Sequence, residues 1–111
     1  RDRLKARRLI HGAEVIIYDR LIGKGVLELA RREAKFINVG KKGFGAHVTQ
    51  DVINEHLVRE AQAGLKVVRL KGGDPSVFGR LDEELAALSE YGIESSVVPG
   101  ITSASAGAAS L

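Results

Sequence analysis

The chain has 111 residues, of which 44% are hydrophobic and 28% are charged, a balance typical of a globular domain and not of a disordered segment. Because it contains no cysteine, disulfides, thiolate metal sites and a thiol nucleophile are excluded. The formal net charge is +3, the basic residues occur in short pairs and not in one block, and only 5% of the residues are aromatic. We therefore expect an anionic small-molecule substrate and no nucleic-acid partner. The apolar runs are too short to span a membrane and no signal peptide is visible, so no membrane partner is expected.

The hydrophobic periodicity predicts helices and strands in alternation. We expect helices over residues 4–12, 26–32, 49–64 and 81–91, and a further helix that begins near residue 104. Strands are expected over residues 14–18, 36–39, 66–70 and 97–98. Since no hairpin signal separates consecutive strands, this order predicts an α/β fold, in which one parallel sheet is flanked by helices on both faces.

The third expected strand leads directly into Gly72-Gly73-Asp74-Pro75. Two glycines allow the backbone to approach a ligand closely, Asp74 offers acceptor oxygens, and Pro75 stiffens the exit of the loop. Ligands of an open parallel sheet bind beyond the carboxyl ends of its strands, where this loop is expected. A purely structural turn is the alternative interpretation of these four residues.

Four expected strand ends carry polar residues, namely Asp19, Lys41, Asp74 and Thr102. In a parallel sheet these ends point the same way, so we expect the four residues to converge on one crevice. Three of them also have a structural interpretation. Asp19 suits a turn cap, Lys41 suits a solvated loop, and Thr102 (or Ser103 in its place) suits the N-cap of the last helix. The N-cap interpretation is compatible with ligand binding, because a helix N-terminus presents free N–H groups.

Other familiar sites lack support in the sequence. The histidines, His11, His47 and His56, do not have the spacing of metal ligands, so we expect no metal site. Neither Gly-x-Gly-x-x-Gly nor Gly-x-x-x-x-Gly-Lys-Ser/Thr is present, which counts against the usual dinucleotide-binding and nucleoside-triphosphate-binding folds.

Five segments follow one another in the order and spacing of a known family. The sequence resembles the uroporphyrinogen-III C-methyltransferases, which belong to the S-adenosylmethionine-dependent tetrapyrrole methylases and also occur as the methylase part of siroheme synthases. The most specific match combines Arg-Leu-Lys-Gly-Gly-Asp-Pro, a following Phe-Gly-Arg, and Val-Pro-Gly-Ile-Thr. The matching segments are residues 15–21, 39–42, 50–54, 67–80 and 98–105.

The resemblance implies a fold of two α/β domains with S-adenosyl-L-methionine bound in the cleft between them. Residues 1–111 would form part of the N-terminal tetrapyrrole methylase domain. The C-terminal methylase domain would be absent from this chain, and so would the glycine-rich cofactor loop that precedes the first helix in the family. A cytoplasmic homodimer is expected with this assignment.

The resemblance also implies roles for single residues. It assigns Asp19 as the proton acceptor and Lys41 as the proton donor. These types suit a reaction in which a pyrrole carbon takes the sulfonium methyl group and the macrocycle then sheds a proton. The implied substrate, uroporphyrinogen III, is a polyanion, which suits Arg20, Lys41 and Lys42. The residues assigned to cofactor binding are Gly72, Gly73, Asp74, Val77, Thr102 and Ser103.

The implied reaction converts uroporphyrinogen III to precorrin-2 in siroheme or cobalamin biosynthesis, and two alternatives stay open. One is another precorrin methylase, or a diphthine-synthase-like methyltransferase that acts on a protein side chain. The other is a non-catalytic folding or dimerisation fragment, since no strand precedes the first helix and the last helix stops within its apolar stretch. Residues 19–21 and 69–78 favour the conversion of uroporphyrinogen III over another substrate.

Overall fold

The computed structural model describes residues 2–18, 24–39, 50–70, 81–98 and 101–106. Its helices are α1 (Asp2–Gly12), α2 (Lys24–Leu29), α3 (Gln50–Gln62) and α4 (Leu81–Glu90). Its strands are β1 (Val15–Tyr18), β2 (Lys35–Asn38), β3 (Val67–Leu70), β4 (Glu94–Val98) and β5 (Ile101–Ser105). None of the helices in these ranges combines the length and the apolar character that crossing a membrane requires.

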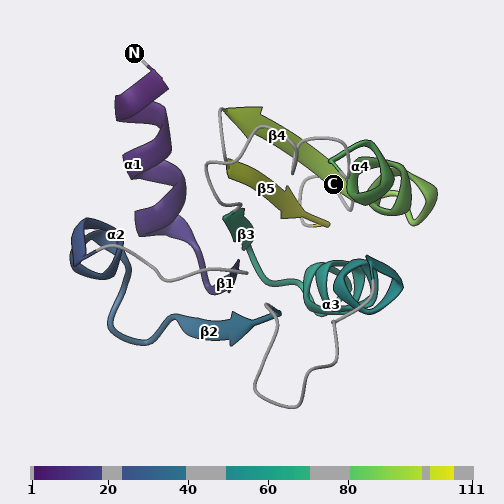
Figure 1. Cartoon of the computed structure of the whole chain (residues 1–111), viewed down its shortest axis with the longest axis horizontal. Coiled ribbons are helices and arrows are strands. Elements are labelled where there is room, and N and C mark those ends of the chain that lie inside the picture. The colour runs from purple at the N-terminus through teal and green to yellow at the C-terminus, as the bar shows by residue number, and fades with distance from the viewer. Residues whose placement is uncertain (1, 19–23, 40–49, 71–80, 99–100, 107–111) are drawn as a thin grey trace.

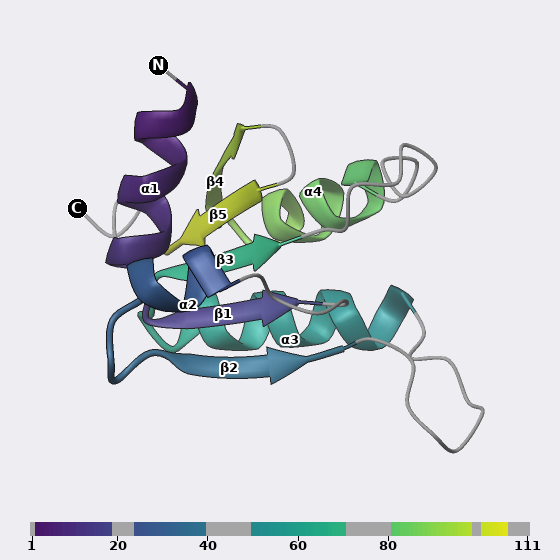
Figure 2. The same cartoon turned by 60° about the vertical axis from the view of Figure 1, so that its left-hand side comes forward.

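The five strands form one sheet in the order β2-β1-β3-β5-β4. β1 pairs in parallel with β2 on one side and with β3 on the other, whereas β5 is antiparallel to both β3 and β4. Figure 2 shows β1, β2 and β3 pointing the same way and β5 running against them. The predicted parallel sheet is therefore confirmed for three strands, and the complete sheet is mixed.

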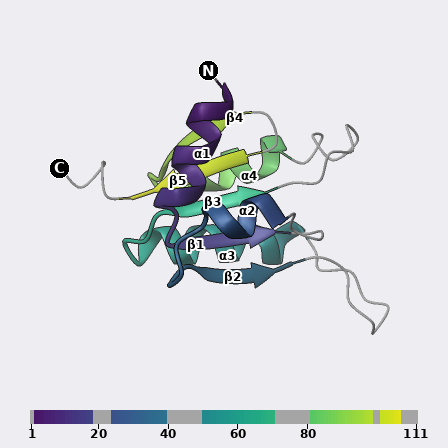
Figure 3. The ribbon, with the colours of Figure 1, turned by 90° about the vertical axis from the view of Figure 1, so that its left-hand side faces the viewer.

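Helices cover both faces of the sheet, as predicted. The pair α1 and α2 lies on one face and the pair α3 and α4 on the other (Figures 1 and 3). Since successive side chains of a strand point to opposite faces, Val15 and Ile17 belong to the core under α3 and α4, and Ile16 belongs to the core under α1 and α2. All three side chains are fully buried, so β1 supplies apolar surface to both cores.

The helices α3 and α4 end at glycines in the left-handed region. Gly64 has a φ of 91° and Gly92 a φ of 73°. After α4, the N–H of Ile93 donates to the carbonyl of Leu88 at 2.9 Å and the N–H of Gly92 donates to that of Ser89 at 3.0 Å. This pair of bonds is the Schellman motif, which requires a residue with positive φ at its centre. The predicted ends of both helices are confirmed.

The C-terminal segment differs from its prediction. Residues 101–105 form β5, between β3 and β4, and not the approach to a helix that begins near residue 104. Thr102 and Ala104 are buried while their neighbours are half-buried, which is the alternation of a strand. Two residues, Pro99 and Gly100, separate β4 from β5 in the sequence. That length suits a hairpin, and Pro-Gly is a turn dipeptide.

Pairing explains why the strand replaces the expected helix. In the middle of the sheet, β5 hydrogen-bonds with β3 on one side and β4 on the other, so it satisfies backbone groups that would otherwise be left without partners. Ile101 and Thr102 are β-branched and favour a strand. The N-cap roles predicted for Thr102 and Ser103 are therefore wrong. The expected helix start at Thr49 and the end of the chain, residues 107–111, lie outside the described residues.

We expect the two glycines Gly64 and Gly12 to respond in opposite ways to alanine. An added Cβ meets no atom within 4 Å at either position, but only Gly64 has a positive φ. Gly64→Ala should lower the free energy of unfolding by about 1 kcal/mol, because the left-handed region is strained for alanine. Gly12→Ala, at the end of α1, should leave it unchanged or raise it by up to ~1 kcal/mol. Urea unfolding followed by circular dichroism measures both, and equal effects would contradict the assignment of φ at Gly64.

A designed disulfide tests the β4–β5 hairpin. Val97 and Thr102 are directly opposite each other in the register, so Val97→Cys with Thr102→Cys should oxidise to one disulfide in a chain that has no other cysteine. Ser96→Cys with Thr102→Cys is the matched control, because a shift of one residue puts the two thiols on opposite faces. A thiol count before and after mild oxidation measures both variants. If the opposed pair stays reduced, residues 101–105 do not form this strand.

Candidate functional site

The carboxyl ends of the parallel strands lie level at one edge of the sheet. Tyr18, the last residue of β1, is in register with Asn38 of β2 and with Leu70 of β3. The N–H of Val39 continues this pairing by donating to the carbonyl of Tyr18 at 2.7 Å. Since β5 is antiparallel, its first residue, Ile101, pairs with Leu70 at the same edge. The described strand ends therefore lie at one edge of the sheet, whereas the convergence of the four residues on one crevice stays a prediction.

Aromatic packing fixes one corner of this edge. The rings of Tyr18 and Phe36 meet edge to face, with centroids 6.4 Å apart and an interplanar angle of 71°, which is a favourable geometry for two aromatic rings. Both side chains lie on the face that carries α1 and α2, because they share the alternation of Ile16 in the strand register. The end of β1 is thus held by side-chain packing on one face of the sheet as well as by its backbone hydrogen bonds.

Most of the predicted site residues follow these strand ends in the sequence. Asp19 comes directly after β1, Lys41 is the third residue after β2, and the glycine pair begins two residues after Leu70. They lie outside the described residues, so their roles stay predictions. The predicted residues concerned are Asp19, Lys41, Gly72, Gly73, Asp74 and Val77.

The other two predicted residues, Thr102 and Ser103, lie on opposite faces of β5. Thr102 is 2% exposed and is directly opposite Arg69 of β3. Ser103 is half-buried, and its hydroxyl donates to the carbonyl of Ser96 at 3.4 Å. The structure therefore brings Thr102 to the carboxyl edge, one residue inside the end of β3, but it does not bring the two side chains together.

A buried ion pair stands at this edge that the sequence reasoning missed. Nε of Arg69 lies 3.3 Å from Oε2 of Glu84, and the two side chains are 1% and 0% exposed. Nη1 of Arg69 also donates to the carbonyl of Leu70 at 3.1 Å. A signal was present in the sequence, because an arginine inside an apolar strand is almost never buried without a partner. Removing one member would leave a buried charge alone, at a cost of ~3–5 kcal/mol.

Metal binding finds no support in the described part of the chain, where no group of three histidine, aspartate or glutamate residues is arranged to hold an ion. One ring nitrogen of His11 is 3.1 Å from the carbonyl of Leu29, and the carbonyl of His11 accepts from Nε of Arg31 at 3.0 Å. These contacts join α1 to α2, so His11 has a structural role.

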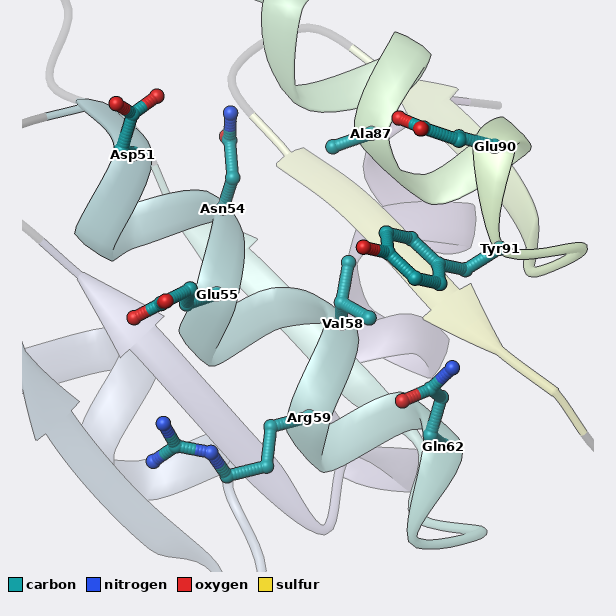
Figure 4. A pocket seen from close by; sticks show the side chains of 9 residues that line it. All are labelled: Asp51, Asn54, Glu55, Val58, Arg59, Gln62, Ala87, Glu90 and Tyr91. Atoms are coloured by element: carbon teal, nitrogen blue, oxygen red, sulfur yellow. The ribbon is translucent and has the colours of Figure 1, made fainter.

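A groove of about 430 Å³ lies between α3 and α4. In Figure 4 the ring of Tyr91, just after α4, reaches toward Val58 of α3, and polar side chains surround the pair. Among the residues that the structure describes, its lining comes from α3, α4 and the residue that follows α4, and it includes neither Thr102 nor Ser103. The lining residues are Asp51, Asn54, Glu55, Val58, Arg59, Gln62, Ala87, Glu90 and Tyr91.

Sequence comparison finds siroheme synthases among the relatives of this chain. The siroheme synthase of Pseudomonas fluorescens is 52% identical over 105 residues, which are 95% of this chain and 23% of that protein. Siroheme synthase 2 of Aeromonas hydrophila is 54% identical over 101 residues, covering 91% of this chain and 22% of that protein. The chain therefore spans less than a quarter of the length of these relatives.

Solved structures agree with this result. Uroporphyrin-III C-methyl transferase of Thermus thermophilus, complexed with S-adenosyl homocysteine, is 45% identical with a TM-score of 0.64, over 87% of this chain and 40% of that one. Cobalt precorrin-4 methyltransferase is 23% identical with a TM-score of 0.67, over 87% of this chain and 38% of that one. At that identity the second likeness shows the fold alone.

The family model for tetrapyrrole (corrin/porphyrin) methylases matches residues 4–111. This match covers nearly the whole chain, and the sheet with helices on both faces is similar to the solved structures above. The resemblance inferred from the sequence motifs is therefore confirmed: the chain belongs to the tetrapyrrole methylases.

Proposed function

We propose that this chain is part of an S-adenosyl-L-methionine-dependent methyltransferase that converts uroporphyrinogen III to precorrin-2. The observation that carries the proposal is the 45% identity to a uroporphyrin-III C-methyl transferase whose structure contains S-adenosyl homocysteine. The siroheme synthase relatives support a place in siroheme biosynthesis, and a place in cobalamin biosynthesis is proposed beside it. Cobalt precorrin-4 methyltransferase, at 23% identity, gives no reason to prefer a later precorrin as substrate.

The described sheet fits a cofactor at its carboxyl edge. Tyr18, Asn38 and Leu70 end level there, and ligands of open α/β sheets bind outside the carboxyl ends of the strands. The segments that follow two of these ends carry the proposed cofactor residues Gly72, Gly73 and Asp74, and the proposed proton acceptor Asp19. When bound, S-adenosyl-L-methionine supplies the methyl group on its sulfonium sulfur.

The proton chemistry is proposed for two residues of this chain. In each methyl transfer that leads to precorrin-2, a pyrrole carbon forms a bond to the methyl carbon as the sulfur–methyl bond breaks, and the macrocycle loses one proton, which keeps its charge in balance. Asp19, as a carboxylate, accepts the proton that the macrocycle loses. Lys41 pairs with the substrate carboxylates, or donates a proton at one position of the macrocycle while a further proton leaves another position, so that the net loss stays at one proton. The basic residues Arg20 and Lys42 attract a polyanion to the same edge.

We further propose that residues 1–111 are part of the N-terminal methylase domain and that a C-terminal methylase domain completes the site. This agrees with the coverage of 23% of the Pseudomonas fluorescens relative. A homodimer and a cytoplasmic location belong to the same proposal.

The direct test of the proposed reaction is to incubate the full natural polypeptide that contains these residues with uroporphyrinogen III and S-adenosyl-L-methionine. Release of S-adenosyl homocysteine with formation of precorrin-2 is expected, and no methylation of this substrate would contradict the proposal.

We expect Asp19→Ala and Lys41→Ala to act mainly on turnover. Each should lower kcat by about 10²–10⁴-fold, the usual contribution of a general acid or base, and should leave the Kd of S-adenosyl homocysteine within about twofold. Steady-state kinetics and calorimetric titration of the full natural polypeptide measure the two effects. The exposed residues Asp51 and Lys24 give matched alanine controls. Wild-type turnover in both site variants would remove the catalytic assignment.

Asp74→Ala should instead weaken the cofactor complex. Loss of a hydrogen bond that involves a charged group costs ~1.5–3 kcal/mol, so the Kd of S-adenosyl homocysteine should rise about 10–100-fold. The same titration measures this change, with Asp51→Ala as the control for the loss of one carboxylate. An unchanged Kd would remove Asp74 from the cofactor site.

A further inference from the structure

The buried pair Arg69–Glu84 joins the end of β3 to the first turn of α4. Nε of Arg69 and Oε2 of Glu84 are 3.3 Å apart, with side chains 1% and 0% exposed. The same guanidinium donates from Nη1 to the carbonyl of Leu70, the last residue of β3, at 3.1 Å. One side chain therefore contacts both the last carbonyl of the strand and the helix that comes next in the chain.

The two members of the pair also stand on either side of segment 71–80 in the sequence. Arg69 stands two residues before segment 71–80, and Glu84 stands four residues after it. Arg69 alternates with Val67 along β3, so it lies on the face that carries α3 and α4. It is also directly opposite Thr102 of β5. The pair thus fixes the two chain ends between which Gly72, Gly73 and Asp74 are placed.

Stability alone does not explain a buried pair of this kind. Two charges lose their hydration when they are buried, and well-packed apolar residues of similar volume commonly stabilise a fold equally well or better. What a guanidinium adds is direction, because its planar set of donors holds a carboxylate and a carbonyl at fixed angles. An interaction with fixed angles can hold the end of β3 and the start of α4 in one relative orientation.

We propose that Arg69 and Glu84 are positioning residues for segment 71–80. They hold the end of β3 and the start of α4 at a fixed separation and orientation, so that the backbone at Gly72 and Gly73 and the carboxylate of Asp74 meet the cofactor in the correct geometry. This inference rests on the proposed function, since that function assigns these three residues to the cofactor.

The chain offers a matched control pair. Nζ of Lys35 on β2 lies 3.3 Å from Oε2 of Glu60 on α3, the same separation as in the buried pair. The Lys35 side chain is 61% exposed, and the two residues flank a different part of the sequence. Replacing this pair removes the same charges without touching the ends of segment 71–80.

The experiment compares Arg69→Met/Glu84→Leu with Lys35→Met/Glu60→Leu in the full natural polypeptide. Three quantities are measured: the melting temperature, the amide exchange rate of peptides from residues 71–80 without cofactor, and the Kd of S-adenosyl homocysteine. For the buried-pair variant we expect a melting temperature within about 4 °C of the wild type. We expect its exchange in residues 71–80 to be at least about tenfold faster and its Kd at least about tenfold higher. The control variant should match the wild type in exchange and in Kd.

A second variant covers loss of folding. Arg69→Lys keeps the charge beside Glu84 but loses the planar set of donors, so it should fold and still raise both the exchange rate and the Kd. Wild-type exchange and Kd in either folded variant overturn the positioning role. Failure of both variants to fold also overturns it, because the pair would then serve stability. If the wild type itself does not bind S-adenosyl homocysteine, the proposed function fails, while the exchange rates still decide whether the pair positions the segment.

Discussion

Strand β1 sets the geometry on which the other elements depend. It pairs in parallel with β2 and β3 along both edges, and Val15, Ile16 and Ile17 are fully buried on its two faces. A slip of one residue would move every one of these side chains to the opposite core, so the register is strongly specified. That register makes β1, β2 and β3 end level. The carboxyl edge, where the motif-bearing segments begin, is therefore a consequence of how β1 is buried.

The hydrophobic periodicity and the positions of the glycines predicted the three parallel strands and the helix ends from the sequence alone. The short apolar runs at 14–18, 36–39 and 66–70 are strands because both faces of the sheet are covered, which removes any need for polar alternation. Gly64 and Gly92 close their helices by adopting positive φ. Such features are local, so a single sequence is enough to locate them.

Features that depend on distant parts of the chain were harder to predict. Residues 101–105 form a strand because β3 and β4 offer backbone partners on both sides, and local propensity does not contain that information. The Arg69–Glu84 pair is a second example, since its members are 15 residues apart and belong to a strand and a helix. Asp19, Lys41, Asp74 and Thr102 were expected at strand ends, and the resemblance to a known family supplied the roles of all the candidate site residues. Of these, the structure describes Thr102 and Ser103, on opposite faces of β5, while the strand ends provide the frame for the others.

We propose that the cofactor binds at the carboxyl edge of β1 and β3 and not in the groove between α3 and α4. Amide exchange of the full natural polypeptide, measured with and without S-adenosyl homocysteine, tests it most directly. We expect slower exchange in peptides from residues 71–80, which follow β3, and no change in peptides from residues 51–62 of α3. Protection confined to α3, with residues 71–80 unaffected, would contradict the account.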